Sequence, residues 1–201
     1  MRDAVRAWRQ RPTLRVPGDT ADTRAMTIRY LMYVLLPAWF IPGVADWVMH
    51  RRTGIEQAGG LRESLVHALM MGEIAVPVTL VLLCEVNPPL LALCLAAGLG
   101  HEATAIWDVR MATDAGREVR PAEQHIHSFL ESLPFMALSA LLCLHWDEVA
   151  DPATWRAPIR LRARRLPGRY LAGVFAGVCG LIAVPYAEEA WRCARARPAR
   201  H

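Results

Sequence analysis

Hydrophobic positions along this chain gather into five long runs separated by shorter polar segments. Each run is long enough, or nearly so, to cross a hydrocarbon core of about 30 Å, for which a helix needs roughly 20 residues. Because lipid cannot satisfy exposed backbone groups, helices rather than strands are expected for such runs. The pattern predicts an all-α integral membrane bundle of about five transmembrane helices. The runs lie at about 27–49, 61–85, 90–108, 121–145 and 169–187.

The segments around the runs predict the connectivity and the domain organisation. Asn87-Pro88-Pro89 breaks the chain after the second run, which indicates a tight antiparallel hairpin between the second and third helices. We expect three parts in all: a basic arm at 1–26 that can form an interfacial helix, a transmembrane helical domain at 27–190, and a basic tail at 191–201.

Composition and charge narrow the class of protein. The 201 residues include 23 basic side chains, all of them arginine, and the net charge is +4. The arginines lie mainly between the apolar runs, where they suit lipid headgroups, so nucleic acid is not an expected partner. The five cysteines form no CxxC or other close pair, which argues against a cysteine-bound zinc. Arginine without lysine is typical of a GC-rich genome, and we expect a multi-pass protein of a bacterial inner membrane.

Histidines and carboxylates gather at the ends of the runs. Alternate helices point in opposite directions, so the end of the first, the start of the second, the end of the third and the start of the fourth reach one membrane face. Residues four or seven apart share a helix face, and this spacing recurs in the pairs Asp46/His50, Glu63/His67, His101/Asp108, Glu123/His127 and His127/Glu131.

These side chains are the donors of a metal site. Imidazole and carboxylate together suit zinc, iron or manganese, and so many donors fit two ions better than one tetrahedral zinc. Interfacial hydrogen bonding is the alternative, but ionisable residues in a membrane are costly, and here they recur on four helices. Which of His125 and His127 faces the metal is left open, and Glu73 and Glu102 are candidate proton carriers. The predicted metal ligands are Asp46, His50, Glu63, His67, His101, Asp108, Glu123, His127, Glu131 and His125.

The motifs resemble those of a known class of enzymes. Asp46-x-x-x-His50, Glu63-x-x-x-His67 and Glu123-x-His125-x-His127 are similar to the histidine motifs of integral-membrane di-iron hydroxylases and desaturases. That resemblance implies a di-iron oxygenase or desaturase-type oxidoreductase that activates oxygen on a lipid-like or hydrophobic substrate. Its electrons would come from an external donor, because the sequence contains no flavin, haem or iron–sulfur motif.

Two further readings stay open. The chain also resembles membrane zinc hydrolases of the ceramidase and receptor-like type, which implies one zinc, an activated water and Asp46 or Glu63 as base. The other is a non-enzymatic metal carrier or sensor, for which ligands at more than one depth are expected. Glu188 and Glu189 fall on the same membrane side as the predicted site, where they could be outer-shell groups, but we expect them to pair chiefly with arginines of the tail.

Overall fold

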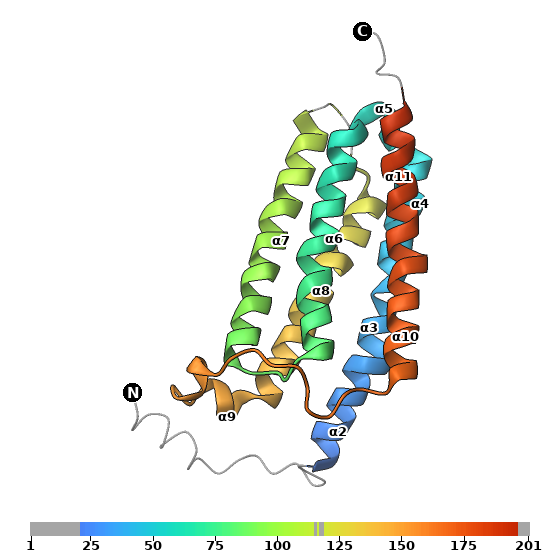
Figure 1. Cartoon of the computed structure of the whole chain (residues 1–201). Coiled ribbons are helices and arrows are strands. Elements are labelled where there is room, and N and C mark those ends of the chain that lie inside the picture. The colour runs from blue at the N-terminus through green and yellow to red at the C-terminus, as the bar shows by residue number, and fades with distance from the viewer. Residues whose placement is uncertain (1–20, 115, 117–118, 197–201) are drawn as a thin grey trace.

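The computed structural model describes residues 21–114, 116 and 119–196, and that part of the chain is all-helical, with no strand. Its long helices run side by side as one bundle (Figure 1). Five helical segments in the described residues are long and apolar enough to cross a membrane, so the predicted all-α class and the predicted number of long helices are confirmed. They span Asp22–Thr53, Gly60–Leu83, Pro88–Asp114, Pro121–Leu144 and Gly168–Arg195.

The first and last segments are interrupted by π-helix. Pro37 and Pro185 lie two residues after these interruptions, where a missing N–H weakens the regular α ladder. The first segment consists of α2 (Ala21–Tyr30), the π-helical η1 (Leu31–Leu35), α3 (Leu36–Ala38) and α4 (Phe40–Thr53). The last consists of α10 (Gly168–Gly177), the π-helical η3 (Val178–Ala183) and α11 (Val184–Arg195).

The three middle helices are continuous and joined by short elements. Gly54 ends α4 with a positive φ of 67°, and the chain turns through the short α5 to reach the next long helix. Pro121 begins the fourth membrane helix, as the sequence predicts. The remaining elements are α5 (Ile55–Ala58), α6 (Gly60–Leu83), α7 (Pro88–Asp114), α8 (Pro121–Leu144), α9 (Trp146–Val149) and the 3₁₀ turn η2 (Thr154–Arg156).

Four helix boundaries lie four or more residues outside the expected ones, and two of these are the ends of α4 at Thr53, expected at 49, and of α7 at Asp114, expected at 108. Helix begins at Ala21, inside the predicted arm, and the last helix continues to Arg195, eight residues beyond the expected end at 187. The added turns are polar: Glu189 packs inward, and the half-buried Glu188 and Arg192 pair with each other. Residues 1–20 of the predicted arm and 197–201 of the predicted tail lie outside the described residues.

The bundle exposes large apolar side chains and buries a group of polar and charged ones. Large apolar side chains such as Leu65, Val76 and Leu99 are exposed on the outside of the bundle, whereas charged groups are buried between the helices. Such a surface suits contact with lipid tails rather than water. The buried polar and charged residues are Asp46, His50, Glu63, Ser64, His67, His101, Thr104, Asp108, Glu123 and Glu189.

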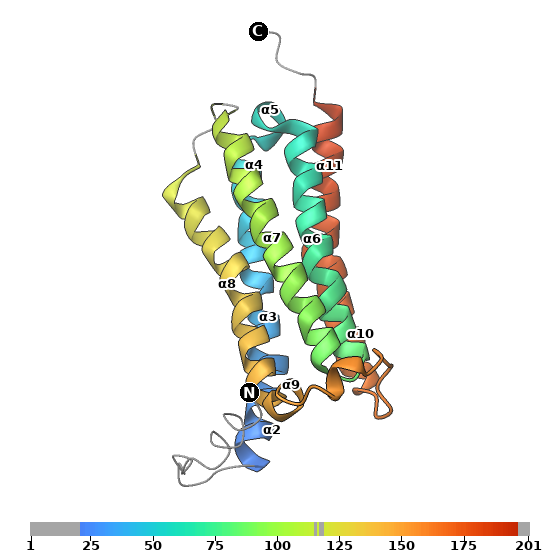
Figure 2. The same ribbon diagram turned by 90° about the vertical axis from the view of Figure 1, so that its left-hand side faces the viewer.

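The packing brings one end of all five long segments together. α6 lies between α7 and α11, and α8 packs against α4 and α7 (Figures 1 and 2). At the opposite end, the connection from α9 to α10 crosses beneath the turn between α6 and α7. Arg162 N donates to Leu83 O at 2.9 Å, and Glu85 N donates to Arg160 O at 2.9 Å. These bonds fix the hairpin that aligns α6 with α7.

Candidate metal centre

Seven histidines and carboxylates from five helices meet near the end of the bundle that carries α5. Six of them are buried and His127 is half-buried. Their ligand atoms form three overlapping groups, and within each group the atoms lie within 4.8 Å of one another. The groups are Asp46, His50 and His127; His50, His67 and Glu189; and Glu63, His67 and Asp108. We call these seven residues the His–carboxylate cluster.

The cluster is built around two stacked imidazoles. His50, on α4, and His67, on α6, have ring centroids 4.4 Å apart and an interplanar angle of 10°. Both rings are buried. The two rings are therefore nearly parallel and in direct contact.

Glu189, on α11, holds both rings by the same edge. His50 Nδ1 lies 2.8 Å from Glu189 Oε2, and His67 Nδ1 lies 3.0 Å from Glu189 Oε1. Because an ionised carboxylate only accepts hydrogen bonds, each imidazole donates from Nδ1. This contact defines the tautomer and leaves Nε2 of each neutral ring with a lone pair, as in the carboxylate–histidine–metal arrangements of metalloproteins.

Each Nε2 atom faces a carboxylate. His50 Nε2 lies 3.5 Å from Asp46 Oδ1, and His67 Nε2 lies 3.4 Å from Asp108 Oδ1. The His50 Nε2 atom is buried and has no hydrogen-bond partner within the described part of the chain. These separations exceed ordinary hydrogen-bond lengths. A cation between nitrogen and oxygen would satisfy both atoms, so the donor set fits a metal ion.

The cluster therefore divides into two half-sites. The first half-site contains Asp46, His50 and His127, and the second contains Glu63, His67 and Asp108. Each offers three side chains with mixed nitrogen and oxygen donors, and Glu189 joins them from behind. The half-sites lie on different helices, because the first is formed by α4 and α8 and the second by α6 and α7.

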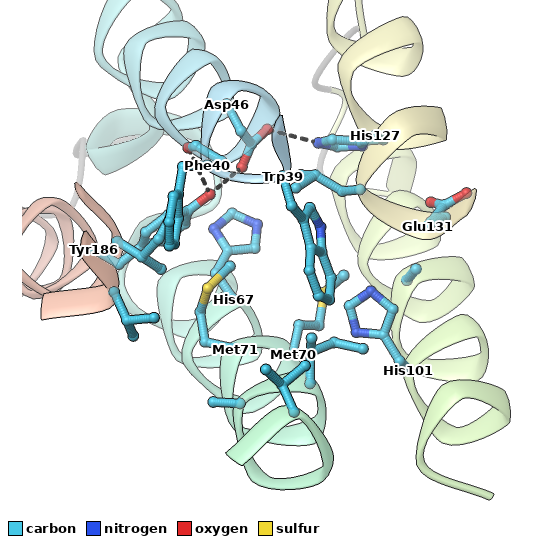
Figure 3. A pocket seen from close by; sticks show the side chains of 18 of the residues that line it. Trp39, Phe40, Asp46, His67, Met70, Met71, His101, His127, Glu131 and Tyr186 are labelled. Carbon is cyan, nitrogen blue, oxygen red and sulfur yellow. Dashed lines mark hydrogen bonds and ion pairs between the residues drawn. The ribbon is translucent and has the colours of Figure 1, made fainter. Parts of the chain in front are cut away.

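Asp46 contacts side chains on two other helices. Its Oδ1 atom lies 2.9 Å from His127 Nε2, and its Oδ2 atom accepts a hydrogen bond of 2.7 Å from the Tyr186 hydroxyl (Figure 3). Tyr186 is on α11 and is itself buried. The hydroxyl fixes the orientation of the carboxylate, while the proton shared with His127 would have to leave when a metal binds.

The position of Glu63 depends on the absence of a side chain at Gly59. It lies at the start of α6, and a Cβ atom at Gly59 would overlap its carboxylate. A larger residue there would push Glu63 out of the second half-site. The local sequence Gly59-Gly60 thus does two things: Gly60 adopts a positive φ of 63° at the start of the helix, and Gly59 leaves space for the carboxylate.

The structure brings some predicted ligands together and leaves others outside. Six of the ten belong to the His–carboxylate cluster: Asp46, His50, Glu63, His67, Asp108 and His127. The other four, which are in none of the three groups, are His101, Glu123, His125 and Glu131. Between His125 and His127, the structure places His127 in the cluster, while His125 is exposed and packs edge-on against Phe129.

His101 forms a separate polar pair deeper in the bundle. Its ring is buried, and Nδ1 lies 3.6 Å from Glu73 Oε2, while Thr104 Oγ1 donates to Glu73 Oε1 at 2.8 Å. Glu73, a candidate proton carrier, is thus beside His101 and outside the cluster. Glu102, the other candidate, and Glu131 are half-buried, and Glu123 is fully buried.

Tyr186 is the member of the site that the sequence did not single out, whereas the sequence allows Glu189 as an outer-shell group but predicts chiefly pairing with arginines of the tail. The adjacent Glu188 turns outward and contacts the Trp47 Nε1 atom at 3.1 Å, the Arg51 guanidinium at 3.6 Å and the Arg192 Nε atom at 3.4 Å. The expected pairing with arginine thus applies to Glu188. The sequence signal for a role of Glu189 in the site was its position at the level of the predicted site.

A cavity of about 120 Å³ opens beside the cluster (Figure 3). We call it the inner cavity. Its polar wall includes Asp46, His67, Asp108 and His127, and its opposite wall is largely apolar, with Met70, Met71, Ile74, Trp39 and Phe40 among its residues. An apolar group in this cavity would lie directly against the half-sites.

The sequence matches no protein-family model, and no curated protein or solved structure matches it significantly. The fold and the site define a class by themselves: an all-helical bundle with five segments able to span a membrane and a buried cluster of groups that could hold a metal ion.

Proposed function

We propose that this chain is an integral membrane oxidoreductase with two metal ions, in the first place iron, that acts on a lipid-like or hydrophobic substrate. The observation that carries the proposal is the pair of stacked rings, His50 and His67, held 4.4 Å apart by Glu189. Metal ions in two-metal sites are about 3.5–4 Å apart. One ion in each half-site would be held by neighbouring, stacked imidazoles.

The donor chemistry favours iron over softer metals. The half-sites combine imidazole nitrogens with carboxylate oxygens, and they contain no cysteine sulfur. Helix bundles commonly hold two iron or manganese ions with carboxylates and histidines that project inward from facing helices. When bound, iron would supply oxygen activation, and an external partner would supply the electrons.

The residues around the cluster have separate roles in this proposal. Glu189 orients the two histidines, Tyr186 orients Asp46, and the apolar wall of the inner cavity holds the substrate and excludes water. His101 lines the inner cavity and has Glu73 beside it, so this pair could accept a proton. The exposed apolar surface supports a place in the membrane, for which we propose the bacterial inner membrane.

A zinc-dependent hydrolase is the second candidate, and a specific observation favours it. The first half-site alone provides three protein ligands, which is the number found in catalytic zinc sites with an open fourth position. In that case one zinc would activate water, and Asp108 or Glu63 of the second half-site would be available as a base.

Elemental analysis of the purified full-length protein separates these functions. Two irons per chain, lost in His67→Ala and retained in His125→Ala, would support the oxidoreductase. One zinc and no iron would support the hydrolase instead. Protein that binds neither metal after reconstitution with each would exclude both. His125→Ala is a suitable control because this imidazole is on the same helix as His127 but faces outward.

A further inference from the structure

A second cavity continues from the inner cavity toward the other end of the bundle. It has a volume of about 290 Å³, and we call it the outer cavity. The two cavities share four lining residues, Leu36, Trp39, Ile74 and Val78. The two cavities are therefore neighbours inside the same helices. We call these four apolar residues between them the waist.

Together the cavities extend over most of the bundle length. On α6, His67 lines the inner cavity and Val81 lines the outer one, and fourteen residues of helix correspond to about 21 Å. Between these levels the walls are almost entirely aliphatic or aromatic. An extended hydrocarbon chain has the shape and polarity that such a space accommodates.

The far end of the outer cavity is cationic. Arg24 and Arg162 both line it, and neither forms an ion pair with a carboxylate among the described residues. Arg162 donates from Nη2 to Val81 O at 2.9 Å, and its Nε atom is buried with no partner in the described structure. Arg24 donates from Nη1 to Leu144 O. A guanidinium has five N–H donors, so most of them stay available.

We propose that the two cavities bind one long-chain fatty acid. Its carboxylate would pair with Arg24 and Arg162, and its chain would pass the waist and end beside the His–carboxylate cluster. The guanidinium fork matches a carboxylate, and cavities of this size hold one small ligand rather than a two-chain lipid. This assignment names the substrate class of the proposed function and rests on it.

The arginines also have a structural role that the test must separate. Val81 and Leu144 lie near the C-terminal ends of α6 and α8, where cationic side chains stabilise helices. That role would make Arg162→Gln less stable without any effect on ligand choice. Arg24 is exposed and its replacement is expected to be tolerated, so Arg24→Gln tests the ligand role independently.

Equilibrium binding to the purified full-length protein in detergent tests the proposal, with hexadecanoate and hexadecanol as probes. We expect one hexadecanoate per chain, at least tenfold tighter binding of hexadecanoate than of hexadecanol, and a loss of roughly tenfold in Arg24→Gln and Arg162→Gln, since charged hydrogen bonds are the strong ones. Arg164→Gln, an exposed position on the same connection, should bind like the wild type.

A bulky residue at the waist is a second test. Ile74→Trp should prevent hexadecanoate binding while the metal content stays unchanged. Equal binding of acid and alcohol, unaltered binding in both arginine variants, or tighter binding of a lysophospholipid would overturn the fatty-acid assignment. Metal content measured on the same samples separates the two proposals: metal without hexadecanoate binding refutes only this inference, and hexadecanoate binding without metal refutes only the proposed function.

Discussion

His50 and His67 stack at a centroid distance of 4.4 Å, and a single carboxylate, Glu189, lies against the Nδ1 atom of each. This relationship joins three helices, because the residues lie on α4, α6 and α11. It orients both Nε2 atoms before any ligand arrives. A site arranged in this way binds a metal ion with little loss of side-chain freedom.

Glu189→Gln should weaken metal binding by about 10-fold to 100-fold, the range typical for partners of ligating histidines. Each histidine faces a different oxygen of Glu189, and the amide replaces one of these oxygens by an NH₂ donor, so one histidine loses its acceptor. Titration of the metal-free protein with Fe²⁺ or Zn²⁺ measures the change. Glu188→Gln is the matched control, since its side chain faces outward, and an equal loss in both variants would contradict the orienting role of Glu189.

His67→Ala should abolish binding of at least one metal ion, whereas His101→Ala should retain the full metal content. The imidazole of His67 belongs to two of the three ligand groups, and that of His101 belongs to none. Elemental analysis of the two purified variants provides the comparison. Loss of metal in His101→Ala alone would show that the centre lies deeper, beside Glu73.

Tyr186→Phe should lower the free energy of unfolding by about 1–3 kcal/mol, because Asp46 Oδ2 would lose its buried donor. For a chain of this size the melting temperature would fall by roughly 2–4 °C per kcal/mol. Thermal unfolding in detergent measures the shift. Tyr30→Phe, at an exposed position, should leave the melting temperature unchanged, and a similar shift in both variants would argue against the buried hydrogen bond as the cause.

Gly54→Ala should destabilise the fold by about 1–2 kcal/mol, since its φ of 67° is costly for a residue with a Cβ atom. Gly72→Ala, inside α6, should be neutral or stabilising by up to about 1 kcal/mol. Neither added Cβ would meet an atom within 4 Å, so the pair isolates backbone conformation from packing. Denaturant unfolding measures both, and equal effects would contradict this account.

The sequence was sufficient to predict the bundle and the face at which its polar groups meet. Length and hydropathy of the runs decide the helices, and alternation of direction decides which ends coincide. The sequence was less informative about the position of each side chain along the helix axis. His101 and Asp108 share a helix face, but seven residues separate them by about 10.5 Å along the axis, which is too far for one ligand sphere. His101 consequently contacts Glu73 and not the cluster.

The hydrophobic periodicity also does not predict where the last helix ends or which histidine of α8 reaches the cluster. His125 and His127 are both on α8, and only packing against α4 brings His127 to Asp46. The last helix continues past its apolar part because Glu189 finds buried partners there, and no run of hydrophobic residues signals this. Buried polar contacts of this kind depend on the neighbouring helices, which the sequence of one segment does not contain.

The π-helical segment η3 lies between α10 and α11 and has a consequence for the comparison of sequences. From the buried Val174, twelve residues of regular α-helix would turn Tyr186 about 120° away from the interior, and fifteen residues would turn Glu189 about 60° away. The wider turns absorb about one extra residue and restore the alignment. In effect η3 is a single-residue insertion inside a membrane helix. A chain with an uninterrupted last helix would carry the equivalent tyrosine and glutamate one position earlier, and an alignment made without a gap would miss them.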